Sequence, residues 1–292
     1  MLHEILPDTI DLQFANRMVT PADTVLCCYK DAIMVLTGDK LVFPLRRQLP
    51  ERPDTDFLYL FSLSGSPIFL MSDFSREETP PGFEMIPAAE LRQGQPQQLA
   101  YAGVLGHQLY RWYMARRFCG HCGGKAVHDT KERMLYCAGC DQREYPTIMP
   151  AVIVGVIHED SLLLTKYAGR LNPRWALVAG FTEAGETPEQ TVRREVLEET
   201  GLRVSQITYY KSQPWPFSGS LLLGYFARLE GPDEITLEAH ELAEAVFVPR
   251  QEIDVPYEGK SLTNEMICQF RDIGPAALLS ADPLRQEPYL PA

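Results

Sequence analysis

The sequence lacks an apolar run long enough to cross a membrane, because no stretch approaches the roughly 20 residues that a spanning helix needs. It also lacks a basic and then apolar leader, since residues 1–13 carry acids where a targeting segment carries positive charge. These two absences predict a cytoplasmic protein without a membrane partner.

Basic residues are in the minority: 27 Lys and Arg stand against 39 Asp and Glu, which gives a formal net charge of −12. Such a surface repels polyanions on average, and this argues against a nucleic-acid binder that ignores base sequence. A small anionic substrate is compatible with this charge, because a bound metal can supply the positive charge that a diphosphate needs.

Cysteine is scarce outside one cluster. Cys119-x2-Cys122 and Cys137-x2-Cys140 are separated by fourteen residues, and two such pairs can close a tetrahedron of thiolates around Zn²⁺. The grouping is typical of a metal site in a reducing compartment and not of a secreted disulfide framework. A closed four-cysteine site has no open coordination position, so we predict a structural zinc. Four incidental buried cysteines are the weaker interpretation.

The 292 residues correspond to about two domains at roughly 150 residues each, and motifs divide them further. We predict four segments: an N-terminal α+β domain (1–115), a zinc ribbon (116–146), an α/β domain (147–275) and a C-terminal tail (276–292). In the first segment we expect strands within Thr24–Leu36, Lys40–Leu45 and Phe57–Leu70, turns at Gly38-Asp39 and Ser64-Gly65-Ser66, and a helix over Leu99–Arg117. The tail, Pro- and Ala-rich from Gly274 on, is expected to lie extended. The first segment contains no catalytic constellation, so packing or dimerisation is its predicted role.

The α/β domain alternates predicted strands and helices, beginning with strands at Ala151–His158 and Ser161–Tyr167. One helix is predicted over Pro188–Thr200. Thr187 is a good N-cap that forms a capping box with Gln190, proline suits the first helical position, and Gly201 suits a left-handed end.

Three acids gather on one face of that helix. Glu195, Glu198 and Glu199 are spaced i, i+3 and i+4, while Val192 and Val196 form the stripe that packs on the sheet. The non-functional interpretation is that these acids form a solvated face of the helix. The Gly-rich loop before the helix, Arg194 beside the cluster and Glu186 in the incoming loop argue against it. Clustered carboxylates suit Mg²⁺ or Mn²⁺ bound together with substrate phosphates.

The stretch from Gly180 to Leu202 resembles the Nudix box, G-x5-E-x7-R-E-U-x-E-E-x-G-U with U aliphatic, at every defined position. The resemblance implies an α/β/α sandwich with a mixed sheet and hydrolysis of a nucleoside diphosphate linked to another group. It further implies that the box glutamates bind the catalytic cations, that Arg194 orients the cluster, and that the carbonyl of Ala179 is a further metal ligand.

A second stretch, Ser212-Gln-Pro-Trp-Pro-Phe-Ser-Gly-Ser220, resembles SQPWPFPxS, the marker of the NADH pyrophosphatase branch of the Nudix hydrolases. Its prolines stiffen the chain, its aromatic rings offer stacking surfaces, and Gln213 and Ser220 offer hydrogen bonds. An aromatic turn packed in the core is the alternative. The zinc ribbon directly before the box agrees with the same branch.

Membership of this branch implies a homodimer that cleaves NAD(H) to nicotinamide mononucleotide and AMP. Carried over by position, the catalytic set is Glu195, Glu198, Glu199, Glu241 and Arg194, and the Mg²⁺ or Mn²⁺ ligands are Ala179, Glu195, Glu199 and Glu241. The substrate contacts are Phe181, Tyr145, Glu132, Gln213, Pro214, Trp215, Pro216, Phe217, Ser218, Gly219, Ser220 and Thr263, with Arg92 near them. Either Glu198 or Glu241 would take the proton from the attacking water.

Two positions depart from the branch pattern. Ser218 replaces the third proline of the marker, and Thr263 stands where a small alanine is expected. They leave open the preference between NADH, NAD⁺ and the NAD cap at the 5′ end of RNA, which contains the same diphosphate. A hypothesis of another class is a nucleotide sensor that binds without hydrolysis; the complete glutamate set argues against it.

Overall fold

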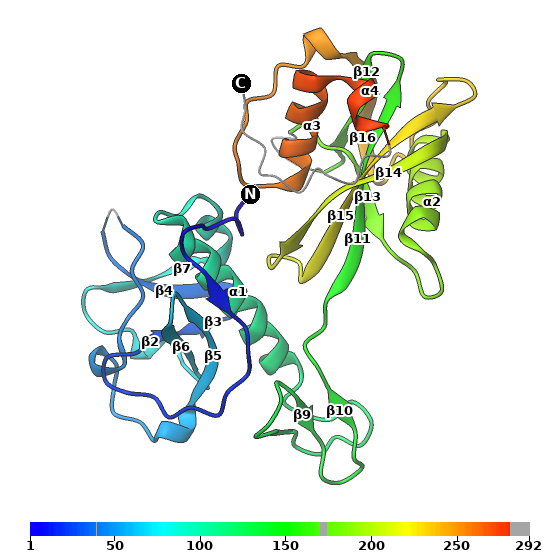
Figure 1. Ribbon diagram of the computed structural model, residues 1–292. Coiled ribbons are helices and arrows are strands. Elements are labelled where there is room, and N and C mark those ends of the chain that lie inside the picture. Colours follow the sequence, from blue (N-terminus) through cyan, green and yellow to red (C-terminus); the bar gives the residue numbers. More distant parts are fainter. Residues whose placement is uncertain (39, 170–173, 281–292) are drawn as a thin grey trace. The chain divides into compact units, whose positions relative to one another are not determined.

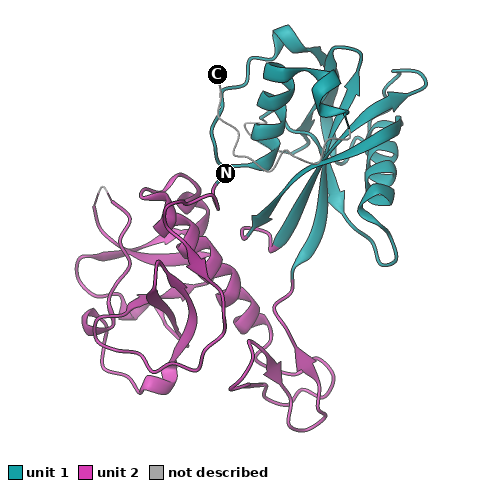
Figure 2. Ribbon diagram, viewed as in Figure 1, with its two compact units in different colours: residues 1, 148–215, 220–292 teal, residues 2–147, 216–219 magenta. Residues whose placement is uncertain are grey.

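The computed structural model describes residues 1–38, 40–169 and 174–280. They form two compact units (Figures 1 and 2). Unit 1 comprises the described residues of Met1, Ile148–Trp215 and Ser220–Ala292, and unit 2 comprises those of Leu2–Thr147 and Pro216–Gly219. The division into four segments stays a prediction, and so does a turn at Gly38-Asp39, because Asp39 lies outside the described residues.

Unit 1 is built on one mixed sheet in the order β14-β15-β11-β12-β16, with β13 paired to β11. The strands are β11 (Met149–His158), β12 (Ser161–Tyr167), β13 (Val178–Phe181), β14 (Arg203–Trp215), β15 (Ser220–Glu230) and β16 (Leu242–Pro249). β11 runs parallel to β15, and the other pairs are antiparallel. Alternate apolar residues of β11 therefore face opposite sides of the sheet.

Helices cover both faces of this sheet. On one face Val152, Val154 and Val156 pack with Val192 and Val196 of α2 (Pro188–Thr200). On the other face Ile153 and Ile157 join a second core cluster with Met266, Ile267 and Phe270 of α3 (Leu262–Ile273). The predicted α/β/α sandwich with a mixed sheet is confirmed (Figure 1).

The described residues of unit 2 form three small sheets and one long helix. The sheets have the orders β1-β5-β6-β2, β3-β4-β7 and β10-β9-β8, and the helix is α1 (Gln97–Ala115). The strands are β1 (Ile10–Asp11), β2 (Thr24–Leu26), β3 (Cys28–Tyr29), β4 (Ala32–Leu36), β5 (Phe57–Leu63), β6 (Ser66–Met71), β7 (Phe83–Pro87), β8 (Val127–His128), β9 (Leu135–Tyr136) and β10 (Arg143–Glu144). One face of α1, with Val104, Leu109, Trp112 and Tyr113, is buried in the core of this unit.

Short helices complete the described elements: the 3-10 turns η1 (Arg46–Gln48), η2 (Asp54–Asp56), η3 (Arg76–Glu78), η4 (Ala88–Gln93) and η5 (Arg250–Glu252), and α4 (Pro275–Leu278). The tail was predicted to be extended from Gly274 on, and for its first residues this prediction is wrong. These residues form the helix α4, in which proline occupies the favourable first position. Residues 281–292 lie outside the described residues.

The predicted strand at Lys40–Leu45 is wrong. This segment divides its backbone hydrogen bonds among separate partners: Val42 accepts from Leu36, and Leu41 donates to Gln95. Leu45 forms only an isolated bridge with Thr24. Pro44 has no N–H to donate, so a continuous ladder cannot form here.

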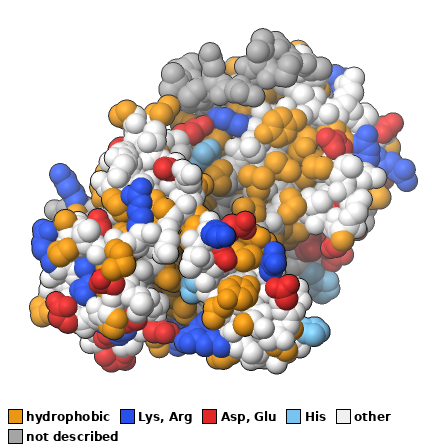
Figure 3. All heavy atoms as spheres, turned by 60° about the horizontal axis from the view of Figure 1, so that its bottom comes forward, with side chains coloured by type: hydrophobic (Ala, Val, Ile, Leu, Met, Phe, Trp, Pro, Cys, Tyr) orange, Lys and Arg blue, Asp and Glu red, His pale blue; other side chains and the backbone are white. Residues whose placement is uncertain are grey.

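Within the described residues, no helix combines the length and the apolar character that crossing a membrane requires. Charged side chains of both signs lie interspersed on the face of the molecule seen in Figure 3.

Candidate active site

Helix α2 begins and ends as its sequence dictates. The Thr187 hydroxyl accepts from the Gln190 amide at 3.3 Å, and the Gln190 side chain accepts from the Thr187 amide at 2.8 Å. Gly201 ends the helix in the left-handed region with φ of 73°. The capping box fixes where the helix begins, and both Glu195 and Glu199 are among the residues of α2 that are buried.

Arg194 contacts one acid before helix α2, Glu186, and two acids within it, Glu195 and Glu198. Its Nε and Nη2 donate to the two carboxylate oxygens of Glu186 at 2.7 and 2.9 Å. Its Nη1 donates to Glu195 at 2.7 Å and to Glu198 at 3.0 Å, and Nη2 also reaches the carbonyl of Phe181 at 2.8 Å. The guanidinium lowers the pKa of Glu186 to about 2. The paired geometry on Glu186 fixes the guanidinium in one orientation.

Glu195 lies against the backbone of Gly180 on β13. A Cβ placed on Gly180 would meet the Glu195 carboxylate carbon at 1.9 Å. The residue is 8% exposed, and burial is the main cause that raises its pKa. Only a residue without a side chain leaves this space for the carboxylate, which explains why the box begins with glycine.

Replacing Gly180 with alanine should leave the fold intact and greatly reduce turnover. The added methyl displaces the end of a side chain and not backbone, so the sheet persists while the Glu195 carboxylate moves. Misplacement of a reacting group by about 1 Å can cost roughly 100-fold in rate. Circular dichroism should match the parent, and the turnover number should fall by about that factor. Unchanged turnover would contradict the assigned role of Glu195.

Glu199 is the most deeply buried acid of the cluster, at 2% exposure. Burial, and then the charges of Glu195 and Glu241, raise its pKa to about 8, while a hydrogen bond from the backbone of Ala179 opposes them. Its Oε2 is buried and has no hydrogen-bond partner among the described residues. A buried carboxylate beside two others is unfavourable unless a cation compensates it.

The three acids of α2 differ in exposure, and this difference tests whether they form a solvated acidic face. The Glu198 side chain is 58% exposed, whereas those of Glu195 and Glu199 are largely buried. A solvated acidic face would expose all three, so it does not describe this helix. Glu241 is near enough to Glu195 and Glu199 for its charge to raise the pKa of each. The structure thus places the four predicted acids in one region of unit 1, where the Ala179 backbone bonds Glu199.

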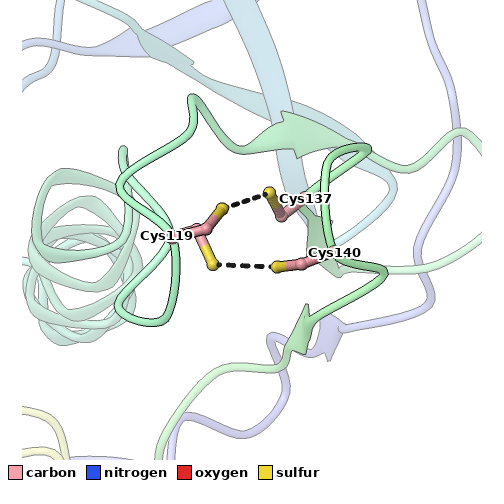
Figure 4. A group of neighbouring side chains, drawn as sticks. Cys119, Cys137 and Cys140 are labelled. Carbon is pink, nitrogen blue, oxygen red and sulfur yellow. Dashed lines mark hydrogen bonds between the residues drawn. The ribbon is translucent and has the colours of Figure 1, made fainter.

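The four predicted zinc ligands form a tight cluster in unit 2. The Sγ atoms of Cys119, Cys122, Cys137 and Cys140 lie within 4.8 Å of one another, and Figure 4 shows three of them labelled. Two of the Sγ–Sγ distances are 3.5 Å (Cys119–Cys140) and 3.4 Å (Cys122–Cys137). These distances are far from the roughly 2.0 Å of a disulfide, and thiolates bound to Zn²⁺ at about 2.3 Å would lie about 3.8 Å apart. The cluster fits a zinc ribbon.

Backbone amides face these sulfurs, as expected for such knuckles. The amides of Cys122 and His121 lower the pKa of Cys119 to about 6. At Gly124 a Cβ would lie 3.3 Å from the sulfur of Cys137, so a larger residue would crowd the cluster. The stabilised thiolate of Cys119 is the form that binds metal.

The marker stretch is not a loop over most of its length. Ser212–Trp215 completes β14, Ser220 begins β15, and a turn of four residues, Pro216–Gly219, joins them. Gln213 is fully buried and bonds the backbone at both ends of its amide: Nε2 donates to the Lys260 carbonyl at 3.0 Å, and Oε1 accepts from Leu262 at 2.7 Å. Its predicted substrate contact stays a prediction, and these bonds indicate that it positions α3 against β14.

The turn Pro216–Gly219 belongs to unit 2. There the carbonyl of Pro216 accepts from Arg111 at 2.8 Å, and Phe217 packs against the apolar core of that unit. Trp215 and Ser220 belong to unit 1 and are paired across the hairpin. The stacking role of Phe217 therefore stays a prediction. Its side chain is already partly buried against the core of unit 2.

Two predicted substrate contacts meet in unit 2. The Tyr145 hydroxyl donates to the Glu132 carboxylate at 2.8 Å, and the Tyr145 ring is 52% exposed. In unit 1, Phe181 is 50% exposed at the end of β13, and Thr263 lies in the first turn of α3. Arg92 lies in η4 of unit 2.

Sequence reasoning missed a buried ion pair beside the marker. Glu265 of α3 is fully buried and accepts from Lys211 at 2.9 Å and from Tyr210 at 3.0 Å. A glutamate at an inward position of an otherwise apolar helix stripe was the available signal. A second missed contact, between Lys166 and the Trp175 ring, had no sequence signal because it joins β12 to a residue eight positions beyond the end of that strand.

Comparison with known proteins agrees with this geometry. Residues 147–270 match the model of the NUDIX domain. This part of the chain is thus similar to a Nudix domain. The chain is 44% identical over 149 residues to the NAD-capped RNA hydrolase NudC of Enterobacter sp. (strain 638), covering 51% of this chain and 56% of that protein. It is 42% identical over 148 residues to the NudC of Salmonella heidelberg (strain SL476), with the same coverage.

The chain thus spans about half the length of the curated relatives it matches. Among solved structures, a NUDIX hydrolase from Nitrosomonas europaea is similar with a TM-score of 0.46 and 24% sequence identity. That similarity covers 53% of this chain and 90% of the other.

Proposed function

We propose that this protein is a metal-dependent hydrolase of the diphosphate linkage in NAD(H), releasing nicotinamide mononucleotide and AMP. The observation that carries the proposal is the buried acid cluster of the Nudix domain, in which Glu199 has an oxygen without a partner. The SQPWPF stretch and the preceding four-cysteine cluster support the choice of dinucleotide.

The residues present fit divalent cations. Glu195, Glu199, Glu241 and the Ala179 carbonyl would hold Mg²⁺ or Mn²⁺, since hard oxygen ligands suit both ions. The orphaned oxygen of Glu199 is the atom that most needs such a partner. When bound, the cations supply Lewis-acid polarisation of a phosphoryl oxygen and activation of a water. The four thiolates of unit 2 would hold Zn²⁺ in a structural role.

The protein's own residues divide the remaining work. Arg194 holds Glu195 and Glu198 in fixed positions through the bonds described above, which keeps the acids oriented. An exposed carboxylate, Glu198 or Glu241, takes the proton of the attacking water. Phe181, half exposed at the end of β13, offers a ring face to the nicotinamide.

The remaining substrate contacts are proposed by resemblance: Tyr145, Glu132, Gln213, Pro214, Trp215, Pro216, Phe217, Ser218, Gly219, Ser220 and Thr263. A homodimer is proposed on the same ground. A cytoplasmic location is proposed because the grouping of the cysteines is typical of a reducing compartment.

A second candidate keeps the chemistry and changes the substrate to RNA carrying a 5′ NAD cap. The names of the similar proteins favour it, since they are described as NAD-capped RNA hydrolases. Cleavage of free NADH and of capped RNA at rising salt separates the two. Extended RNA contacts would make capped-RNA cleavage fall steeply with salt, whereas recognition of the cap alone would make both rates fall in parallel.

A candidate of another class is a sensor that binds nucleotide without hydrolysis. The complete glutamate set argues against it. Nucleotide binding by a folded, metal-supplied protein that releases no mononucleotide from NADH would establish the sensor instead.

Zinc removal should affect unit 2. The strands around the cysteines are only two residues long each, so they depend on the metal for cross-linking. We expect one zinc per chain, falling well below one in Cys137→Ser, with rapid proteolysis between residues 119 and 145. The control Cys268→Ala, a buried cysteine of α3, should retain one zinc per chain. Full zinc content in Cys137→Ser would contradict the assigned ligand.

A further inference from the structure

A lysine lies on the α3 face of the Nudix sheet, at the end of β12. Leu162 and Leu164 pack in the core cluster beneath α3, and alternation along the strand places Lys166 on the same face. Figure 1 shows α3 covering this side of the sheet. On this face of β12, Lys166 is the next residue after Leu164, which is buried in the core. Lys166 therefore lies at the edge of that core.

Two neighbours hold the ammonium of Lys166. Its Nζ lies 2.7 Å from the Glu244 carboxylate of β16 and 4.0 Å from the centre of the Trp175 ring. The Trp175 ring packs against the core beneath α3, so the lysine covers the ring face that the core leaves open. The Lys166 side chain is 26% exposed and that of Glu244 is 47% exposed. The cation is thus preoriented but still accessible.

The same face and the same end of the sheet carry predicted site residues. Ala179 packs against the core beneath α3, so Phe181, two residues later on β13, lies on that face as well. The Ala168 amide, two residues after Lys166, donates to the Glu241 carbonyl at 2.9 Å. Lys166 therefore lies on the face where Phe181 is exposed, and the chain just after it contacts the backbone of Glu241.

The charge of this region requires another cation for a diphosphate. Arg194, the basic residue of the box, is engaged by Glu186, Glu195 and Glu198. Lys166 is engaged by a single exposed carboxylate, Glu244, which water can solvate when the lysine leaves. An ammonium exchanging an exposed carboxylate for a phosphate loses little and gains a charge-assisted hydrogen bond.

We propose that Lys166 binds a phosphate oxygen of the dinucleotide, leaving Glu244 when substrate arrives. Trp175 is a positioning residue, because the centre of its ring lies 4.0 Å from the Lys166 ammonium. This inference rests on the proposed function, because it assumes that the diphosphate lies at the acid cluster. The alternative role, a latch that joins β12 to β16, makes opposite predictions for substrate affinity.

The test is steady-state hydrolysis of NADH by four variants of the full chain. Lys166→Met should raise KM about 10- to 100-fold, the range of one hydrogen bond to a charged group, and Lys166→Arg should recover most of that loss. Glu244→Gln removes the competing anion and should lower KM about two- to threefold. The expected change is small because an exposed ion pair contributes little free energy. Arg228→Met removes a cation from the opposite end of β11 and β15 and should leave KM unchanged.

Calorimetric binding of AMP to the same variants separates this inference from the proposed function. If the parent binds AMP but does not hydrolyse NADH, weaker AMP binding by Lys166→Met still supports the phosphate contact. Equal KM and equal AMP affinity in Lys166→Met and the parent would overturn it. A fall in thermal stability in both Lys166→Met and Glu244→Gln, with KM unchanged in both, would establish the latch instead.

Discussion

Glu199→Gln is expected to lose turnover by about three orders of magnitude, the upper range for removing one electrostatic group from an active site. Glutamine keeps the size of the side chain and can still accept the backbone hydrogen bond from Ala179. It carries no negative charge to bind a cation. The variant should fold as the parent does, because burial among Glu195 and Glu241 makes the charged form of Glu199 unfavourable in the metal-free protein.

The melting temperature with and without Mn²⁺ identifies the cause of this loss. The parent should be stabilised by Mn²⁺, since a ligand that binds only the folded state raises its stability, and Glu199→Gln should respond much less. Glu189→Gln, an exposed acid in the first turn of the same helix, is the matched control and should respond as the parent does. An unchanged Mn²⁺ response in Glu199→Gln would show that Glu199 is not a metal ligand.

Arg194→Met is expected to reduce both stability and turnover. The change leaves Glu186 without its paired partner. It also leaves the largely buried carboxylate of Glu195 without a neighbouring cation. Breaking a buried pair costs about 3 to 5 kcal/mol, and partial exposure of the Arg194 side chain should bring this down to about 2 to 3 kcal/mol. Turnover should fall about 100-fold, because Glu195 and Glu198 lose the group that fixes them.

Urea denaturation and steady-state kinetics measure the two effects separately. Arg193→Met, the exposed neighbour on the same helix, should leave both quantities within error of the parent. Arg194→Lys restores the charge but not the paired geometry on Glu186, so it should recover stability better than turnover. Full turnover in Arg194→Met would contradict the organising role that we assign to this arginine.

The helix of the acid cluster could be predicted from the sequence because its signals are local. Thr187, Gln190 and Gly201 define its ends through contacts within four residues, and the structure has those bounds. Each Cys-x2-Cys pair is likewise a local signal, and it predicted which four sulfurs would meet. The α/β/α sandwich with a mixed sheet followed from the resemblance to a family and not from any single stretch, and the order of its strands was not predicted.

Contacts between distant elements could not be predicted. The spacing of the glutamates gathers their side chains but does not say that Glu195 and Glu199 are buried while Glu198 is exposed, because burial depends on how α2 packs against β13. Gln213 was expected at the substrate, yet the backbone of Lys260 and Leu262, nearly fifty residues away, occupies both ends of its amide. Pattern and propensity contain no information about such partners.

The central claim is metal-dependent cleavage of a dinucleotide, and chromatography of the products tests it most directly. Purified, zinc-loaded protein is incubated with NADH, NAD⁺, ADP-ribose and NAD-capped RNA, with and without Mg²⁺ or Mn²⁺. The account predicts AMP and reduced nicotinamide mononucleotide from NADH, only when the divalent metal is present and only when Glu199 is intact. Folded protein that releases no mononucleotide from any of the four compounds in the presence of metal would contradict it.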